Sequence, residues 1–210
     1  CNETLRKPFY EGQWFYEACE KHSIFASSCV YPIKGFHLLL EAMPEVLRQY
    51  PDARINVCGR SFLQSGLRQN GYEKYLAGLA KKYGLTDKIT CLGSLSAGQM
   101  KENYLKANAF VLPSTMENSP NSLGEAMLLG TPSVAADVGG VASILDPEEG
   151  ILCPPVSPEA IAQGIRRVFA LEDQAAAMGE RARAHARITH DPKTNLDTLL
   201  AIYRQLSEGA

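Results

Sequence analysis

Short apolar runs alternate with amphipathic segments along most of the chain. The apolar runs are typical of buried strands and lie at residues 24–27, 53–58, 89–92, 109–112, 132–136 and 151–152. The segments with helical spacing lie at residues 35–50, 72–83, 96–107, 119–130, 141–145 and 157–169, with further helical segments reaching about residue 206. The pattern predicts an α/β fold: a doubly wound, Rossmann-like parallel sheet of about six strands, with helices on both faces.

The start of the chain differs from this pattern. The first 22 residues are rich in Phe, Tyr and Trp but show no clear period, and the chain begins with Cys1 rather than methionine. We interpret residues 1–23 as a lead-in or linker that packs against a missing neighbour, and residues 24–210 as one domain. The chain is therefore expected to be a fragment of a longer protein.

Charge and cysteine content narrow the classes of function. Twenty-one basic and 23 acidic residues give a net charge of -2, and the basic residues are scattered, which argues against a nucleic-acid surface. No apolar stretch approaches the roughly 20 residues that cross a bilayer. The six cysteines form no Cys-x-x-Cys pair, and Cys58 and Cys91 lie in apolar runs, so we expect a reducing, cytoplasmic compartment.

Two glutamates flank a turn in the second half of the chain. Glu117 follows the apolar run 109–112, and Glu125 lies in the helical segment that stops at Gly130. The carboxylates thus bracket a strand-to-helix turn, at the edge where open α/β sheets bind ligands. Free N–H groups at the helix start lie between them. This layout suits a ligand with hydroxyls at both ends and phosphate in the middle.

The residues around this turn form an extended motif. It reads Pro113-Ser114-x-x-Glu117-x7-Glu125-Ala126-Met127-x-x-Gly130-x-Pro132, and Gly139-Gly140 follows. Lys34-Gly35, at the start of the first long helix, supplies a second motif. From residue 24 to about 206 the chain resembles the donor-binding half of retaining glycosyltransferases with the GT-B fold, above all the large family 4, or "group 1".

The resemblance implies roles for three charged residues. Glu117 would contact hydroxyls of the transferred sugar, Glu125 would hold the nucleotide ribose, and Lys34 would bind phosphate, so that Glu117 and Lys34 act in the reaction itself. A carboxylate accepts two strong bonds from vicinal hydroxyls. Explanations without a ligand stay open for all three residues. Glu125 would form a capping box with Ser122, Glu117 would be an exposed acid of the loop, and Lys34 would be a solvated lysine in the first helical turn.

The same resemblance implies a set of further contacts to the nucleotide sugar. Backbone amides at a helix start bind anions, and Ser119-Pro120 would cap that helix, with proline at its first position. Gly139-Gly140 admits close approach of a ligand or forms a tight turn. The expected lining residues are Asn121, Ser122, Ser119, Pro113, Ser114, Gly59 and Gly93.

One position departs from the family pattern. Group 1 enzymes usually end their first strand with Gly-Arg, and the arginine helps to hold the diphosphate, whereas this chain has Ser28-Cys29. The Ser28 hydroxyl can donate to phosphate but carries no charge. Either Lys34 and the helix start suffice, or Arg60 after the second strand compensates, or the donor binds more weakly.

The sequence contains none of the motifs that are typical of several other binding sites. The four histidines show no metal-ligand spacing, and no Asp-x-Asp occurs, so we expect neither a metal nor a cofactor beyond the nucleotide sugar. No Gly-x-Gly-x-x-Gly follows the first strand, and no Walker-type loop is present.

The expected function is transfer of a hexose from a nucleoside-diphosphate sugar to an acceptor hydroxyl with retention. The acceptor, a glycan or a lipid-linked molecule, would bind a missing N-terminal domain. Lipopolysaccharide or capsule synthesis, in the cytoplasm or at the inner membrane face, would fit. The alternatives are a non-catalytic nucleotide-sugar module or degenerate transferase, a sugar-nucleotide epimerase and a phosphorylase.

Overall fold

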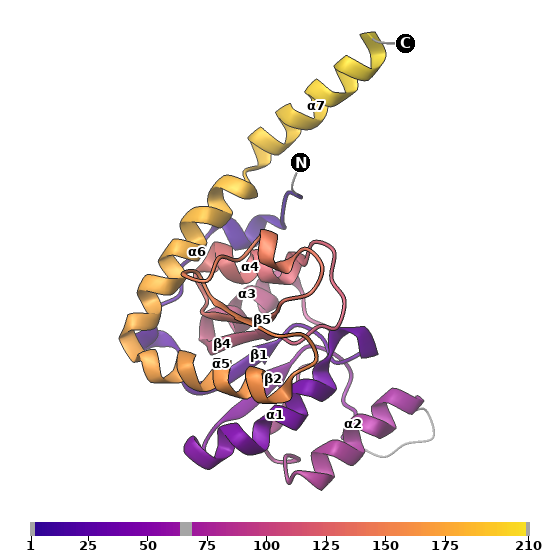
Figure 1. Ribbon diagram of the computed structural model, residues 1–210, viewed down its shortest axis with the longest axis vertical. Helices are drawn as coiled ribbons and strands as arrows, with labels where there is room; N and C mark the ends of the chain where they lie inside the picture. Colours follow the sequence, from indigo (N-terminus) through magenta and orange to yellow (C-terminus); the bar gives the residue numbers. More distant parts are fainter. Residues whose placement is uncertain (1–2, 64–68, 209–210) are drawn as a thin grey trace.

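The computed structural model describes residues 3–63 and 69–208, so residues 1–2, 64–68 and 209–210 of the predicted lead-in and domain lie outside it. Its centre is a six-stranded sheet, sandwiched between helices (Figure 1). The strands are β1 (Glu20–Ala26), β2 (Arg54–Val57), β3 (Ile89–Cys91), β4 (Ala107–Leu112), β5 (Ser133–Ala136) and β6 (Ile151–Cys153). All pairs are parallel, in the order β3-β2-β1-β4-β5-β6. The prediction of a doubly wound, Rossmann-like sheet is confirmed.

The helices follow the predicted alternation with the strands. They are α1 (Phe36–Gln49), α2 (Gly71–Lys82), α3 (Ala97–Lys106), α4 (Asn121–Leu129), α5 (Pro158–Leu171), α6 (Ala175–Thr189) and α7 (Pro192–Glu208). The segment predicted as a short helix at 141–145 is instead a 3₁₀ turn, Val141–Ser143. Ser96 and Ser157 cap α3 and α5, each accepting a hydrogen bond from a backbone N–H three residues on.

Alternating strand residues build a core on each face of the sheet. On β1, Ile24 and Ala26 pack with side chains of α1, α2 and α5, whereas Phe25 packs with those of α3, α4 and α6. The reason is the two-residue period of a strand, which sends successive side chains to opposite faces. Both faces are buried along β4 and along the second half of β1, and these stretches carry mostly apolar side chains.

The N-terminal lead-in belongs to the core. Leu5 and Phe9 are buried in the cluster of α3 and α4, and the Trp14 indole Nε1 donates to the Ala107 carbonyl at 2.7 Å. The expectation that this aromatic segment packs against a missing neighbour is wrong for Phe9 and Trp14. The first strand also begins at Glu20, before the predicted start at residue 24. An irregular chain with few but large apolar side chains gives no period from which its packing could be predicted.

Helix α7 extends away from the body that the sheet and the other helices form (Figure 1). Its exposed apolar side chains are Leu196, Leu199, Leu200, Ile202, Tyr203 and Leu206. Within the described residues, no helix is both long enough and apolar enough to cross a membrane.

Replacing Phe9 tests whether the lead-in is part of the folded domain. Phe9→Ala removes a fully buried ring that packs edge-on against Tyr104, so we expect the free energy of unfolding to fall by about 3–5 kcal/mol. Phe15→Ala, at a ring that is 54% exposed, should change it by no more than about 0.5 kcal/mol. Urea denaturation measures both, and equal small effects would show that the lead-in contributes nothing to the fold.

Candidate functional site

A cleft of about 490 Å³, called here the central cleft, opens at the carboxyl ends of β1 and β4. The strand order reverses direction between these two strands, and open α/β sheets bind ligands at such a switch point. The residues that line the central cleft are Thr4, Leu5, Arg6, Ser27, Ser28, Lys34, Met100, Glu117, Ser119, Pro120, Asn121, Ser122 and Glu125. The three charged groups predicted to converge therefore share one cleft.

Lys34 and Glu117 form an ion pair in this cleft. The Lys34 Nζ lies 2.7 Å from the Glu117 Oε1, which also accepts a hydrogen bond from the Ser114 hydroxyl at 2.7 Å. The Glu117 side chain is 7% exposed, so it is not the exposed loop acid of the alternative explanation. A bound polyhydroxyl or phosphate group would meet a carboxylate and an ammonium that are already oriented.

Glycines set the shape of the loop that carries Glu117. A Cβ at Gly139 would lie 1.8 Å from the Glu117 carbonyl oxygen, and one at Gly140 would lie 2.0 Å from that of Asn118. Only glycine permits this approach, and Gly139 also has a φ of 55°, in the left-handed region. Gly35 allows an equally close approach to the end of β4, because a Cβ at this position would lie 1.8 Å from the Pro113 carbonyl oxygen.

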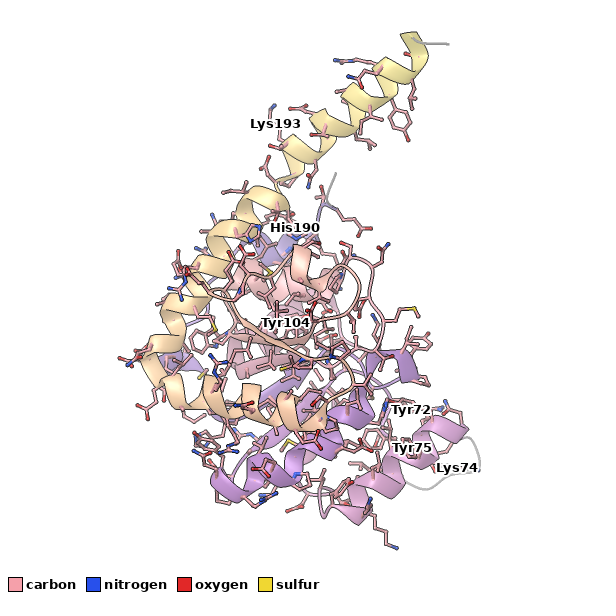
Figure 2. All side chains as sticks on the ribbon, in the orientation of Figure 1. Tyr72, Lys74, Tyr75, Tyr104, His190 and Lys193 are labelled. Carbon is pink, nitrogen blue, oxygen red and sulfur yellow. The ribbon has the colours of Figure 1, made fainter. Side chains whose placement is uncertain are left out.

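Glu125 is a buried carboxylate with two partners. Its Oε1 accepts from Arg6 Nε at 2.8 Å and lies 2.7 Å from Nη2. Its Oε2 accepts from the Tyr104 hydroxyl at 3.4 Å. Tyr104 is fully buried, within the body of the protein (Figure 2). Burial raises the pKa of Glu125, and Arg6 opposes the rise. The capping-box alternative with Ser122 is not observed, since Glu125 bonds to these side chains instead.

The start of α4 faces the central cleft between the two glutamates. Its N-cap is Pro120, which offers no side-chain hydrogen bond, and Asn121 and Ser122 are the first two helical residues. The N–H groups at the start of a helix and the positive end of its dipole attract anions. Phosphate oxygens fit this position.

A second hollow of about 600 Å³, called here the side cleft, adjoins the central cleft and shares Ser27 and Ser28 with it. The predicted residues Gly59, Arg60 and Gly93 line it. The Arg60 guanidinium bonds to Glu73 at the start of α2, with Nη2 2.6 Å from Oε1.

Cys29, at the position of the usual arginine, is buried and does not line either cleft. Its thiol lies 3.7 Å from the Cys58 carbonyl oxygen, close to Gly59. A hydrogen bond with Cys91 and burial raise the pKa of Cys29, so this position brings no charge to the clefts.

Comparisons with known proteins show the family of the chain. The family described as "Glycosyl transferases group 1" matches residues 18–185. The chain belongs to the group 1 glycosyl transferases. A D-inositol 3-phosphate glycosyltransferase of Segniliparus rotundus is 33% identical over 182 residues, which are 86% of this chain and 39% of that protein. The chain thus spans about two-fifths of the length of this relative.

Solved structures share the fold of this group 1 chain. The sucrose-phosphate synthase of Thermosynechococcus elongatus superposes with a TM-score of 0.79 at 24% identity, over 96% of this chain and 53% of that one. Anabaena Alr3699/HepE, in complex with UDP and glucose, gives 0.70 at 22% identity, over 90% and 48%. The sheet and its helices match the C-terminal domain of GT-B glycosyltransferases.

Some local predictions for the group 1 motifs are wrong. Ser119 does not cap α4, because the helix begins at Asn121 and Pro120 takes the N-cap position. Lys34 does not lie in the first turn of α1. It ends a separate 3₁₀ turn, Pro32–Lys34, so the assumed unfavourable position in the helix dipole does not exist. Pro113 and Ser114 are not among the lining residues; Ser114 instead holds Glu117.

Other features of the chain form no part of this site. A larger hollow of about 800 Å³ lies between α1 and α5, where Arg166 and Glu45 form an ion pair 3.0 Å long. Asp146, Glu149 and His185 bring one possible metal-ligand atom each within 4.8 Å of one another. Sequence spacing did not indicate this group, because His185 comes from α6 and the two acids from the loop before β6.

The lining of the central cleft also contains four residues that no sequence pattern indicated: Arg6, Thr4, Leu5 and Met100. Three of them come from the lead-in, which has no periodicity. Arg6 is separated from Glu125 by 119 positions, and no local pattern in this sequence connects two residues so far apart.

Replacement of Gly139 by alanine tests the close contact between Gly139 and the Glu117 carbonyl oxygen. Gly139→Ala forces a left-handed φ on alanine and a Cβ into the Glu117 carbonyl, so we expect a loss of at least about 1–3 kcal/mol of stability. Gly98→Ala, in α3 with open space around its Cβ, should stabilise by about 0.4–1 kcal/mol. Thermal unfolding of the two variants compares them, and equal shifts would contradict the contact.

The burial of Glu125 predicts a pH dependence. Because the folded state raises the pKa of Glu125, its favourable contribution to stability is complete below about pH 4 and is lost as pH rises through the folded pKa. The free energy of unfolding of Glu125→Gln, minus that of the unchanged chain, should therefore increase between pH 4 and 7. A difference that decreases over this range would show that Arg6 outweighs the burial.

Proposed function

We propose that this chain is the donor-binding part of a glycosyltransferase that moves a hexose from a nucleoside diphosphate to an acceptor hydroxyl and retains the anomeric configuration. The observation that carries the proposal is the convergence of Lys34, Glu117, Glu125 and the start of α4 in the central cleft. The solved Alr3699/HepE structure, which shares the fold, holds UDP and glucose.

Each group in the cleft has a matching part of the donor. The start of α4 and Lys34 bind the diphosphate, as a helix dipole and an ammonium both favour anions. Glu117 accepts bonds from hydroxyls of the sugar, and Glu125 from the hydroxyls of the ribose. Together the two clefts provide room for the sugar, the diphosphate and the nucleoside along the carboxyl edge of the sheet.

The difficult step of the transfer is departure of the diphosphate. As the bond from the anomeric carbon to the diphosphate oxygen breaks, negative charge grows on that oxygen, and Lys34 and the α4 amides stabilise it. The acceptor oxygen bonds to the anomeric carbon from the same face, and its proton passes to a phosphate oxygen of the leaving group. No side-chain base is required in this sequence of events.

The acceptor site is proposed to lie outside this chain. We propose that an N-terminal domain binds the acceptor, a glycan or lipid-linked molecule of lipopolysaccharide or capsule synthesis, in the cytoplasm or at the inner face of the membrane. Curated relatives that are longer than this chain, such as the S. rotundus glycosyltransferase, agree with a protein of two domains.

A second candidate is a nucleotide-sugar module without transferase activity. It is favoured by Cys29, which is buried and uncharged where the family places an arginine. A longer protein that binds the donor but never transfers or hydrolyses it would support this candidate over the transferase.

Calorimetry with UDP, GDP and ADP tests the proposal on the folded chain. We expect heat of binding from at least one of the three nucleotides, because the proposed diphosphate ligands, Lys34 and the start of α4, both belong to this chain. A folded chain that gives no heat with any of them would overturn the proposal.

The role of Glu125 is tested by Glu125→Ala. We expect the nucleotide that binds the unchanged chain to lose about 1–3 kcal/mol of binding free energy, because ribose hydroxyls would be left without their acceptor. Glu102→Ala, at an exposed position in α3, is the matched control and should leave the affinity unchanged. A lower melting temperature with unchanged affinity would instead assign Glu125 a purely structural role.

A further inference from the structure

The lead-in supplies one of the two positive side chains that line the central cleft. The lining contains the cations Lys34 and Arg6 and the carboxylates Glu117 and Glu125. Each cation is paired with one carboxylate, Lys34 with Glu117 and Arg6 with Glu125. Because the paired charges cancel, these four side chains together carry no net charge. Binding of a diphosphate in the cleft therefore depends on where the N–H donors of the two cations point.

The Arg6 guanidinium has donors beyond those that Glu125 uses. Its Nε and Nη2 both reach the Glu125 Oε1, whereas a guanidinium carries five N–H groups. The Glu125 side chain is 4% exposed and that of Arg6 is 49% exposed. One edge of the guanidinium thus contacts a buried carboxylate, while the Arg6 side chain as a whole is half exposed and belongs to the lining of the cleft.

The position of Arg6 is held from several sides. The guanidinium carbon lies 5.0 Å from the centre of the Phe9 ring, and Phe9 itself is fully buried. The neighbouring Leu5 is buried, and its N–H donates to the Tyr10 hydroxyl, which in turn donates to the His190 carbonyl at 2.6 Å. A side chain anchored in this way loses little conformational entropy when it binds a ligand.

We propose that Arg6 is a donor-binding residue, which holds Glu125 with one edge of its guanidinium and donates to the diphosphate with the other. It would supply, from the lead-in, the charge-assisted bonds that Cys29 does not supply from the end of β1. A planar guanidinium suits this double task, because it can serve a carboxylate and a phosphate at once. This inference rests on the proposed function, since it assumes that the central cleft takes a nucleoside diphosphate.

The contributions of the two edges of the Arg6 guanidinium can be measured separately by comparing two ligands, one with the diphosphate and one without it. Calorimetry would compare Arg6→Ala with the unchanged chain, using the nucleoside and the nucleoside diphosphate of whichever base binds among UDP, GDP and ADP. We expect Arg6→Ala to weaken the diphosphate at least 10-fold and the free nucleoside less than 3-fold. Lys7→Ala removes the adjacent exposed charge and should leave both affinities within 2-fold.

The outcomes decide between a ligand contact and an indirect effect. An equal loss for nucleoside and diphosphate would overturn the proposal, because Arg6 would then act only by orienting Glu125 for the ribose. Unchanged affinities would overturn it as well. If the unchanged chain binds none of the three nucleotides, the proposed function itself fails, and that result is distinct from either outcome.

A second pair of variants guards against misfolding of Arg6→Ala, which leaves the buried Glu125 charge unpaired. Glu125→Gln removes that charge and serves as the new reference. In this background, addition of Arg6→Ala should still weaken the diphosphate at least 5-fold relative to the nucleoside, and addition of Arg6→Lys should weaken it less. Equal affinities for the diphosphate in the Glu125→Gln protein, with and without the added Arg6→Ala substitution, would overturn the proposal.

Discussion

The central cleft depends on backbone segments that touch without side chains between them. The loop of Glu117 and Asn118 rests on Gly139 and Gly140, and the end of β4 rests on Gly35, at distances that no Cβ could occupy. These contacts fix the height of the Glu117 loop above the sheet. They also fix the distance from that loop to the start of α4, because the loop directly follows β4 and leads into this helix. The geometry of the charged groups follows from this packing.

The second constraint is electrostatic. Glu117 and Glu125 are both buried, and a buried carboxylate loses hydration that its partners must replace. Lys34 and Arg6 provide the compensation from two other parts of the chain, the turn before α1 and the lead-in. Removal of either cation would leave a negative charge next to the place where we expect a diphosphate. The ion pairs therefore keep the cleft ready for an anion as well as stabilising the fold.

Much of the fold could be predicted from the sequence, because strands buried on both faces leave continuous apolar runs and helices leave a regular period. The strand-to-helix turn with Glu117 and Glu125 was also predictable, since both residues are close in sequence and the carboxyl edge of a parallel sheet brings ligand groups together. Local signals were less informative. Ser119-Pro120 looks like a cap followed by the first helical residue, yet α4 starts at Asn121 and Pro120 itself takes the N-cap position. Arg6 was not predictable, because its contact with Glu125 arises only when the lead-in folds onto α3 and α4.

Helix α7 differs from the rest of the protein in what keeps it folded. Its first turn is capped by Asp191, whose carboxylate accepts from the Thr194 N–H at 2.7 Å, and Lys193 pairs with Asp197 one turn on. These are contacts within the helix itself, and its apolar side chains lie largely in water. A single helix of this length is marginal without tertiary packing. Few contacts therefore couple its winding and unwinding to the sheet, so the 17 residues of α7 can melt while the edge of the sheet that carries the central cleft stays folded.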